Sequence, residues 1–295
     1  MALLYFSKLN INSKIYDVYQ DDNIRIEILN SIIEKMSQEN EIIDTDKVRY
    51  KFCDLIKNYD EMYVAGRLVK IFEGENESYN KEKDTVDIIP ADDCASHITF
   101  YFDVKNEQIT FIRRRDFGYI QFNNCFKLLL EQYFDDVEFE VYLEKNIDQL
   151  KEKMAKFKQI LKVEITIVPP NANDEDFRRL FGTNSEEFKE TNATKYTQTL
   201  STSAKNKKGI NWRTDFFERM FYGIAKGYGD MSADGKNFSG ERYTVTSDED
   251  APFTRPIPDN EKHSLSAITE RGKQYISELI SQKIRMELNE KEAKK

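Results

Sequence analysis

The stretch HITFYFDVKNEQITFIRRRDFGYI, residues 97–120, decides how the first part of the chain folds. Apolar and polar residues alternate on both sides of a polar turn, which predicts two antiparallel strands joined as a hairpin. The second strand ends in Arg113, Arg114 and Arg115, an unusual cluster for an acidic chain. The sequence therefore raises the question of what these three guanidinium groups contact.

The composition narrows the classes of function. A chain of 295 residues is long enough for one large domain or two small ones. Its net charge of −9 repels phosphate, which excludes non-specific coating of nucleic acid and leaves only local patches as polyanion sites. Three cysteines and two histidines show no metal-ligand spacing, so we expect no metal and no cofactor.

No stretch of the sequence has the character of a membrane span or a leader. No apolar run approaches the ~20 residues that a membrane span needs. The first residues, MALLYFSKLNI, lack a basic region followed by an apolar run of signal-peptide length. We therefore expect a cytoplasmic protein.

The first half of the chain reads as strands with one early helix. We expect short strands at residues 3–11 and 15–19, and an amphipathic helix that Asp21 and Asp22 cap at its N-terminus. Two alternating segments, KVRYKFCDLI and MYVAGRLVKIF, predict paired strands. Residues 73–93 follow with eight acids against two lysines, and we expect them to form a solvated acidic loop.

After the hairpin, the pattern predicts helix, strand, helix and strand. The second of these helices is expected to carry apolar residues from Ile147 to Leu161 on one face, and the last strand to end at Pro169 and Pro170. A strand–helix–strand unit implies a crossover with its two strands parallel in one sheet. Residues 1–170 are therefore predicted to form one domain with a mixed, largely antiparallel sheet and flanking helices.

The C-terminal part, residues 171–295, has a different character. Residues 182–210 are polar and partly basic, and we expect this segment to be mobile. A helix that starts near Trp212 should end at Gly227 or Gly229, followed by a hairpin that turns at Gly240 and by a long C-terminal helix. The fold class is thus α+β, with a more helical C-terminal part.

Tests for catalytic motifs give no catalytic residue. There is no Walker A loop. The glycines of GIAKGYG follow a helix and not a strand, so we interpret them as a C-terminal helix cap. Two scattered histidines do not assemble a Ser–His or Cys–His pair. A nuclease-like carboxylate–lysine core fails because Glu144 and Lys145 are adjacent and would leave opposite faces of a strand.

Two basic clusters remain as candidate nucleic-acid-binding residues. Arg113–Arg115 either neutralise the acids of residues 73–93 or contact phosphate through guanidinium forks. The second cluster lies in AKNKKGINWR, beside Trp212, which either contacts nucleic acid or begins the helical core. The candidate binding residues are Arg113, Arg114, Arg115, Lys205, Lys207, Lys208 and Arg213.

The order of elements over residues 90–250 resembles the RexA and KwaB type of bacterial and prophage defence proteins, from the Rex exclusion and Kiwa systems. The resemblance rests on the hairpin HITFYF…ITFIRR, the strand VEITIVPPN and a helical segment that ends in GYG before a hairpin. It implies an antiphage protein in the cytoplasm that binds DNA as a sensor or effector, as a homodimer. It also implies a membrane-protein partner encoded nearby, with a phage protein as a possible trigger.

Two other functions fit the same residues. One is a metal-dependent nuclease effector that infection activates, which requires a carboxylate cluster that the linear sequence does not display. The other is a scaffold that recognises a protein and contacts no nucleic acid.

Overall fold

The strand β1 (Ala2–Ile11) is an interior strand of the larger of two sheets, and both of its faces are buried. Tyr5 and Leu9 point into one apolar cluster, whereas Leu4 and Phe6 point into another on the opposite face. This explains why the start of the chain reads as an almost continuous apolar run. The computed structural model describes residues 1–171, 173–183 and 185–293.

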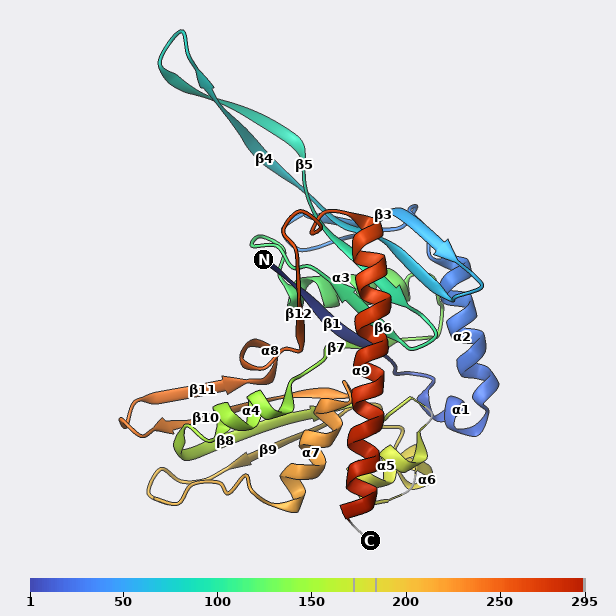
Figure 1. Ribbon diagram of the computed structural model, residues 1–295, viewed down its shortest axis with the longest axis vertical. Coiled ribbons are helices and arrows are strands. Elements are labelled where there is room, and N and C mark those ends of the chain that lie inside the picture. The colour runs from blue at the N-terminus through green and yellow to red at the C-terminus, as the bar shows by residue number, and fades with distance from the viewer. Residues whose placement is uncertain (172, 184, 294–295) are drawn as a thin grey trace.

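The first sheet has the strand order β12-β1-β6-β5-β4-β3-β2, and β7 also pairs with β1 (Figure 1). The remaining strands of this sheet are β2 (Glu41–Ile43), β3 (Arg49–Asn58), β4 (Tyr63–Asn80), β5 (Thr85–Asp103), β6 (Gln108–Phe111), β7 (Phe139–Leu143) and β12 (Thr254–Ile257). The second sheet has the order β11-β10-β8-β9. Its strands are β8 (Phe157–Ile167), β9 (Tyr196–Ser201), β10 (Gly229–Asn237) and β11 (Arg242–Thr246).

Helices cover both faces of the first sheet. The helices are α1 (Ile15–Gln20), α2 (Asp22–Lys35), α3 (Tyr119–Glu131), α4 (Ile147–Met154), α5 (Asp174–Phe181), α6 (Ser185–Thr191), α7 (Asp215–Ala225), α8 (Ser247–Asp250) and α9 (Leu265–Ala293). The helices α2 and α3 share one apolar cluster with the sheet. The long α9 packs on the opposite face, against β4, β5 and β6, and runs down to the level of α5 and α7 in Figure 1. A glycine permits this close packing, because a Cβ at Gly272 would lie 2.6 Å from the Tyr101 ring.

The predicted α+β class is confirmed, and so are several single elements. Every pairing among the described strands is antiparallel. The helix α2 follows Asp21, whose carboxylate accepts a hydrogen bond from the backbone N–H of Asn23. The helix α7 is followed by Gly227 at φ +81°, and the hairpin β10–β11 turns at Gly240.

Two early predictions are wrong. Residues 15–19 belong to the short helix α1, because buried Ile15 and Val18 are three apart and share a helical face. Residues 73–93 are no loop. They form most of a two-stranded ribbon, residues 72–80 and 85–95, in which β4 and β5 pair only with each other (Figure 1). Apolar residues are scarce there because the ribbon packs against no core, although its residues do form strands.

The strand–helix–strand prediction is also wrong in part. The helix α4 ends at Met154, and Phe157 already begins β8, so the stripe expected up to Leu161 belongs to two elements. The strands β7 and β8 lie in different sheets, so no parallel crossover forms. The segment 182–210, expected to be mobile, contains α6 and β9. The second sheet combines strands from both sides of residue 170, and the division into domains at that residue stays a prediction.

Buried charges occupy the boundary between the two sheets. Glu144, fully buried just after β7, accepts hydrogen bonds from Lys283 Nζ, 2.7 Å from both carboxylate oxygens, and from Gln108 Nε2 at 2.8 Å. Glu107, 1% exposed, accepts from Arg25 Nε at 2.8 Å and from Lys8 Nζ at 3.3 Å. Burial acts to raise the pKa of Glu107, but the charges of Lys8 and Arg25 outweigh it and lower the pKa. These pairs connect the first sheet with α2 and α9.

Removing one member of the buried pair should destabilise the fold strongly. We expect Glu144→Gln to lower the free energy of unfolding by about 3–5 kcal/mol, because Lys283 must then either hold a buried charge without a counterion or give up its proton. Urea unfolding at constant pH measures the loss. The double variant Glu144→Gln/Lys283→Met should recover most of it, and a cost below about 1 kcal/mol for the single variant contradicts this role.

The same lysine should give stability an alkaline pH dependence. Burial lowers the pKa of Lys283 from 10.5 to about 8, against the opposing effect of Glu144. The unfolded chain therefore binds this proton more tightly, so the contribution of Lys283 to stability rises as the pH increases from about 8 to about 10.5. Unfolding free energies of the wild type and Lys283→Met, compared across that window, should diverge in favour of the wild type. A constant difference contradicts the low pKa.

Candidate anion-binding site

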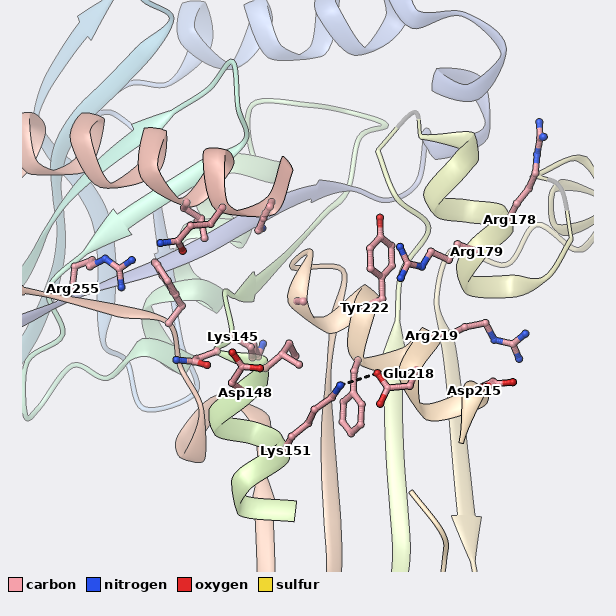
Figure 2. A pocket seen from close by; sticks show the side chains of 18 residues that line it. Lys145, Asp148, Lys151, Arg178, Arg179, Asp215, Glu218, Arg219, Tyr222 and Arg255 are labelled. Atoms are coloured by element: carbon pink, nitrogen blue, oxygen red, sulfur yellow. Dashed lines mark hydrogen bonds and ion pairs between the residues drawn. The ribbon is translucent and has the colours of Figure 1, made fainter. Parts of the chain in front are cut away.

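A cavity of about 1020 Å³ opens beside the boundary between the sheets. Its walls come from α4, α5, α7, the start of β12 and the C-terminal half of α9 (Figure 2). The amphipathic helix α7 buries Phe217, Met220 and Ile224 against the second sheet. Its opposite side is left to face the cavity with Asp215, Glu218 and Arg219.

Cations outnumber acids around this cavity. Seven basic side chains line it, against three carboxylates, although the whole chain is acidic. The basic residues are Lys145, Lys151, Arg178, Arg179, Arg219, Arg255 and Lys283, and the acids are Asp148, Asp215 and Glu218. Such a local excess of positive charge attracts anions even where the net charge of the protein repels them.

At least four of the seven cations have acidic partners. Lys151 Nζ lies 2.7 Å from Glu218 Oε2, across the gap between α4 and α7 in Figure 2. Lys145, whose side chain is fully buried, pairs with Asp248 at 2.6 Å, and Lys283 pairs with Glu144. Arg255 lies 4.0 Å from Glu278. These ion pairs fix the walls of the cavity.

Two arginines at the rim have no acidic partner in the part of the chain that the structure describes. Arg178 and Arg219 are exposed, and neither forms an ion pair there. In Figure 2 both extend from neighbouring helices at the same side of the cavity. An exposed guanidinium group without an ion pair is suited to a bidentate contact with a phosphate. The third arginine, Arg179, stacks on Tyr222 with its guanidinium carbon 3.4 Å from the ring centroid.

A buried carboxylate holds Tyr222 in place. Asp176, 3% exposed, accepts hydrogen bonds from the hydroxyl groups of Tyr222 and of Tyr228, the latter at 2.9 Å. Lys226 Nζ lies 3.6 Å from the same carboxylate. Burial, followed by the hydrogen bond to Asp176, raises the pKa of the Tyr222 phenol, so it stays a neutral donor. The cavity wall beneath Arg179 is thus rigid.

The described residues offer no ready metal site. Within them, no group of three or more His, Cys, Asp or Glu side chains is arranged to hold a metal ion.

The described helices include none with the length and apolar character to cross a lipid bilayer.

The predicted arginine cluster lies away from this cavity. Arg113–Arg115 follow β6 in an irregular segment before α3, near the N-terminus in Figure 1. None of the three forms an ion pair with an acid in the described residues, so the alternative in which residues 73–93 neutralise them is wrong. Arg113 lies over the Tyr5 ring at 5.4 Å, and Arg114 donates to the carbonyl of His97 at 3.5 Å. Their contact with phosphate stays a prediction.

The predicted lysine cluster lies in the segment that joins β9 to α7. Lys205, Lys207 and Lys208 are exposed there, and Arg213 lies over the Trp212 ring at 5.2 Å. Trp212 also packs on the apolar cluster of the second sheet, as its structural interpretation requires. In Figure 1 this segment runs along the edge of the molecule opposite to the arginine segment. The structure therefore does not join the two clusters into one groove.

Sequence reasoning missed the cavity because acids flank its arginines along the chain. Arg178 and Arg179 stand in NDEDFRRLF, and Arg219 stands in TDFFERMF, so neither segment reads as basic. The available signal was the amphipathic character of α5 and α7. Their apolar faces pack together in the second core cluster, which brings the arginines on their other faces to one side.

Fold and cavity together define an α+β protein of two antiparallel sheets with a cation-lined cavity beside their boundary. Residues 4–274 match the DUF4747 family, described as a domain of unknown function. Since the match covers most of the chain, the protein belongs to this family. No curated protein is significantly similar to the chain in sequence.

The hydrogen bond behind the cavity wall should be measurable as stability. We expect Tyr222→Phe to lower the free energy of unfolding by about 1.5–3 kcal/mol, because the buried Asp176 carboxyl group is then short of one donor. Chemical denaturation compared with the wild type measures the difference. Tyr243→Phe, which changes a half-buried tyrosine of β11 for which no hydroxyl hydrogen bond is seen in the described residues, is the matched control. Equal effects of the two changes contradict the proposed anchoring.

Proposed function

We propose that this protein binds DNA through the cation-lined cavity, as a cytoplasmic component of antiphage defence that works with a partner protein. The observation that carries DNA binding is the pair of exposed arginines, Arg178 and Arg219, at the rim of a cavity where basic side chains exceed acids. The antiphage role and the partner rest on the resemblance to RexA and KwaB proteins. Homodimer formation and a membrane-protein partner belong to the same proposal.

The placement of charge supports selective contact over uniform coating. The net charge of −9 and the acidic ribbon repel DNA from most of the surface. Phosphates that reach the cavity rim find guanidinium groups that need not first break an ion pair. The stacked pair of Arg179 and Tyr222 adds a flat surface at the same place, of the kind on which unpaired bases stack.

A titration of DNA at several salt concentrations tests the proposal. We expect Arg178→Ala/Arg219→Ala to weaken binding about tenfold, and to flatten the slope of log K against log salt by roughly 0.9 for each phosphate that the variant no longer neutralises. Both side chains are exposed, so the melting temperature should stay unchanged. Fluorescence anisotropy with a labelled duplex and with a single strand measures both the affinity and the salt slope.

A matched control separates a specific contact from a change of net charge. Lys236→Ala/Arg242→Ala also removes two exposed positive charges, at the far end of the β10–β11 hairpin, and should leave the affinity nearly unchanged. A triple change of Lys205, Lys207 and Lys208 to alanine tests the second basic cluster. If that variant loses affinity while Arg178→Ala/Arg219→Ala does not, the cavity is not the DNA site.

A further inference from the structure

The two histidines of the chain, far apart in the sequence, lie next to each other in the fold. His97 belongs to β5 and His263 precedes α9, and their ring centroids are 6.3 Å apart. They line a small cleft of about 280 Å³ together with Arg113, Arg114, Arg115 and Lys262. Asp116 is the one carboxylate among the residues that line it. We call this the two-histidine cleft.

The cations of this cleft outnumber its one carboxylate, Asp116. In the described part of the chain, none of its three arginines forms an ion pair, and neither does Lys262. Arg67, which lies close to the cleft, is paired with Asp54. Unpaired like charges gathered in one place repel one another, and this repulsion persists until an anion binds among them.

The histidines respond to this crowding. Burial lowers the pKa of His97, and the charges of Arg114 and Arg67 lower it further, with only Asp54 acting in the opposite direction. Burial, Arg114 and Lys262 likewise lower the pKa of His263. Both rings are therefore mostly neutral at neutral pH, and each can take up a proton when a negative charge enters the cleft.

We propose that the two-histidine cleft binds a compact dianion, the terminal phosphate of a nucleic acid strand, and that the histidines take up protons as it binds. The cleft is too small for a duplex but admits a phosphoryl group with the sugar that carries it. Guanidinium groups and imidazolium rings are the donors that phosphate oxygens prefer. The inference rests on the proposed function only in taking nucleic acid as the carrier of the phosphate.

The first experiment uses sulfate, which keeps both charges across the pH range of histidine titration. Because the chain has two histidines, NMR resolves each ring, and His97→Gln and His263→Gln assign the signals. We expect sulfate to raise the pKa of both histidines. By linkage, the affinity for sulfate should rise about tenfold or more as the pH falls from about 8 to about 5.5.

Two variants show where the response originates. Arg113→Ala/Arg114→Ala should abolish the effect of sulfate and raise the ligand-free pKa of His97, since Arg114 no longer opposes its protonation. Arg178→Ala/Arg219→Ala should retain the full response, because the cavity is a separate site. If sulfate leaves the pKa of both histidines unchanged, or shifts it equally in Arg113→Ala/Arg114→Ala, the cleft is not an anion-binding site.

The second experiment identifies the terminal phosphate. A short single strand with a 5′-phosphate should bind the wild type at least about fivefold more tightly than the same strand with a 5′-hydroxyl. The difference should vanish in His97→Gln/His263→Gln. Equal binding of the two strands to the wild type overturns the terminal-phosphate assignment. If neither strand binds while the sulfate response persists, the proposed DNA function fails and the anion site of the cleft stands.

Discussion

The ion pair between Glu144 and Lys283 is the contact on which the arrangement of this molecule depends. Glu144 has no access to solvent and the Lys283 side chain is only 15% exposed, so the carboxylate has no water to replace the lysine as its partner. A helix that packs on a sheet through apolar side chains alone can slide by a turn at modest cost. An unpaired buried charge makes that slip expensive. The pair therefore fixes the register of α9, and with it the position of the cavity wall that Leu279 and Gln282 provide.

Folding concentrates positive charge that the sequence disperses. The cavity collects arginines from α5, α7 and β12, and the two-histidine cleft collects side chains from β5, from the segment after β6 and from the segment before α9. Each site takes cations from stretches that also contain acids, and in each site the basic side chains outnumber the carboxylates. An acidic protein can in this way present two separate cationic surfaces and still repel polyanions over most of its area.

The sequence predicted local patterns well and long-range placement poorly. Alternation identified β1 and the hairpin of β5 and β6, and a capping aspartate identified α2. The prediction failed for short segments whose apolar spacing fits both a helix and a strand, as at Ile15–Gln20 and at Phe157. Arg113–Arg115 were recognisable because they are consecutive. The proximity of His97 to His263, and of Arg178 to Arg219, depends on contacts between elements that no local pattern encodes.

The ribbon of β4 and β5 has a mechanical meaning. Near the body, β4 is held by β3 and β5 by β6, whereas beyond Phe72 the two strands have only each other. The inner part is therefore held rigidly in the sheet, and the outer part projects from it without further support. The strand β5 runs from the outer part to His97, with an irregularity in its pairing with β4 between Ala91 and Cys94. Any body that grips the tip therefore acts through a long lever, and its torque arrives at the strand that carries one wall of the two-histidine cleft.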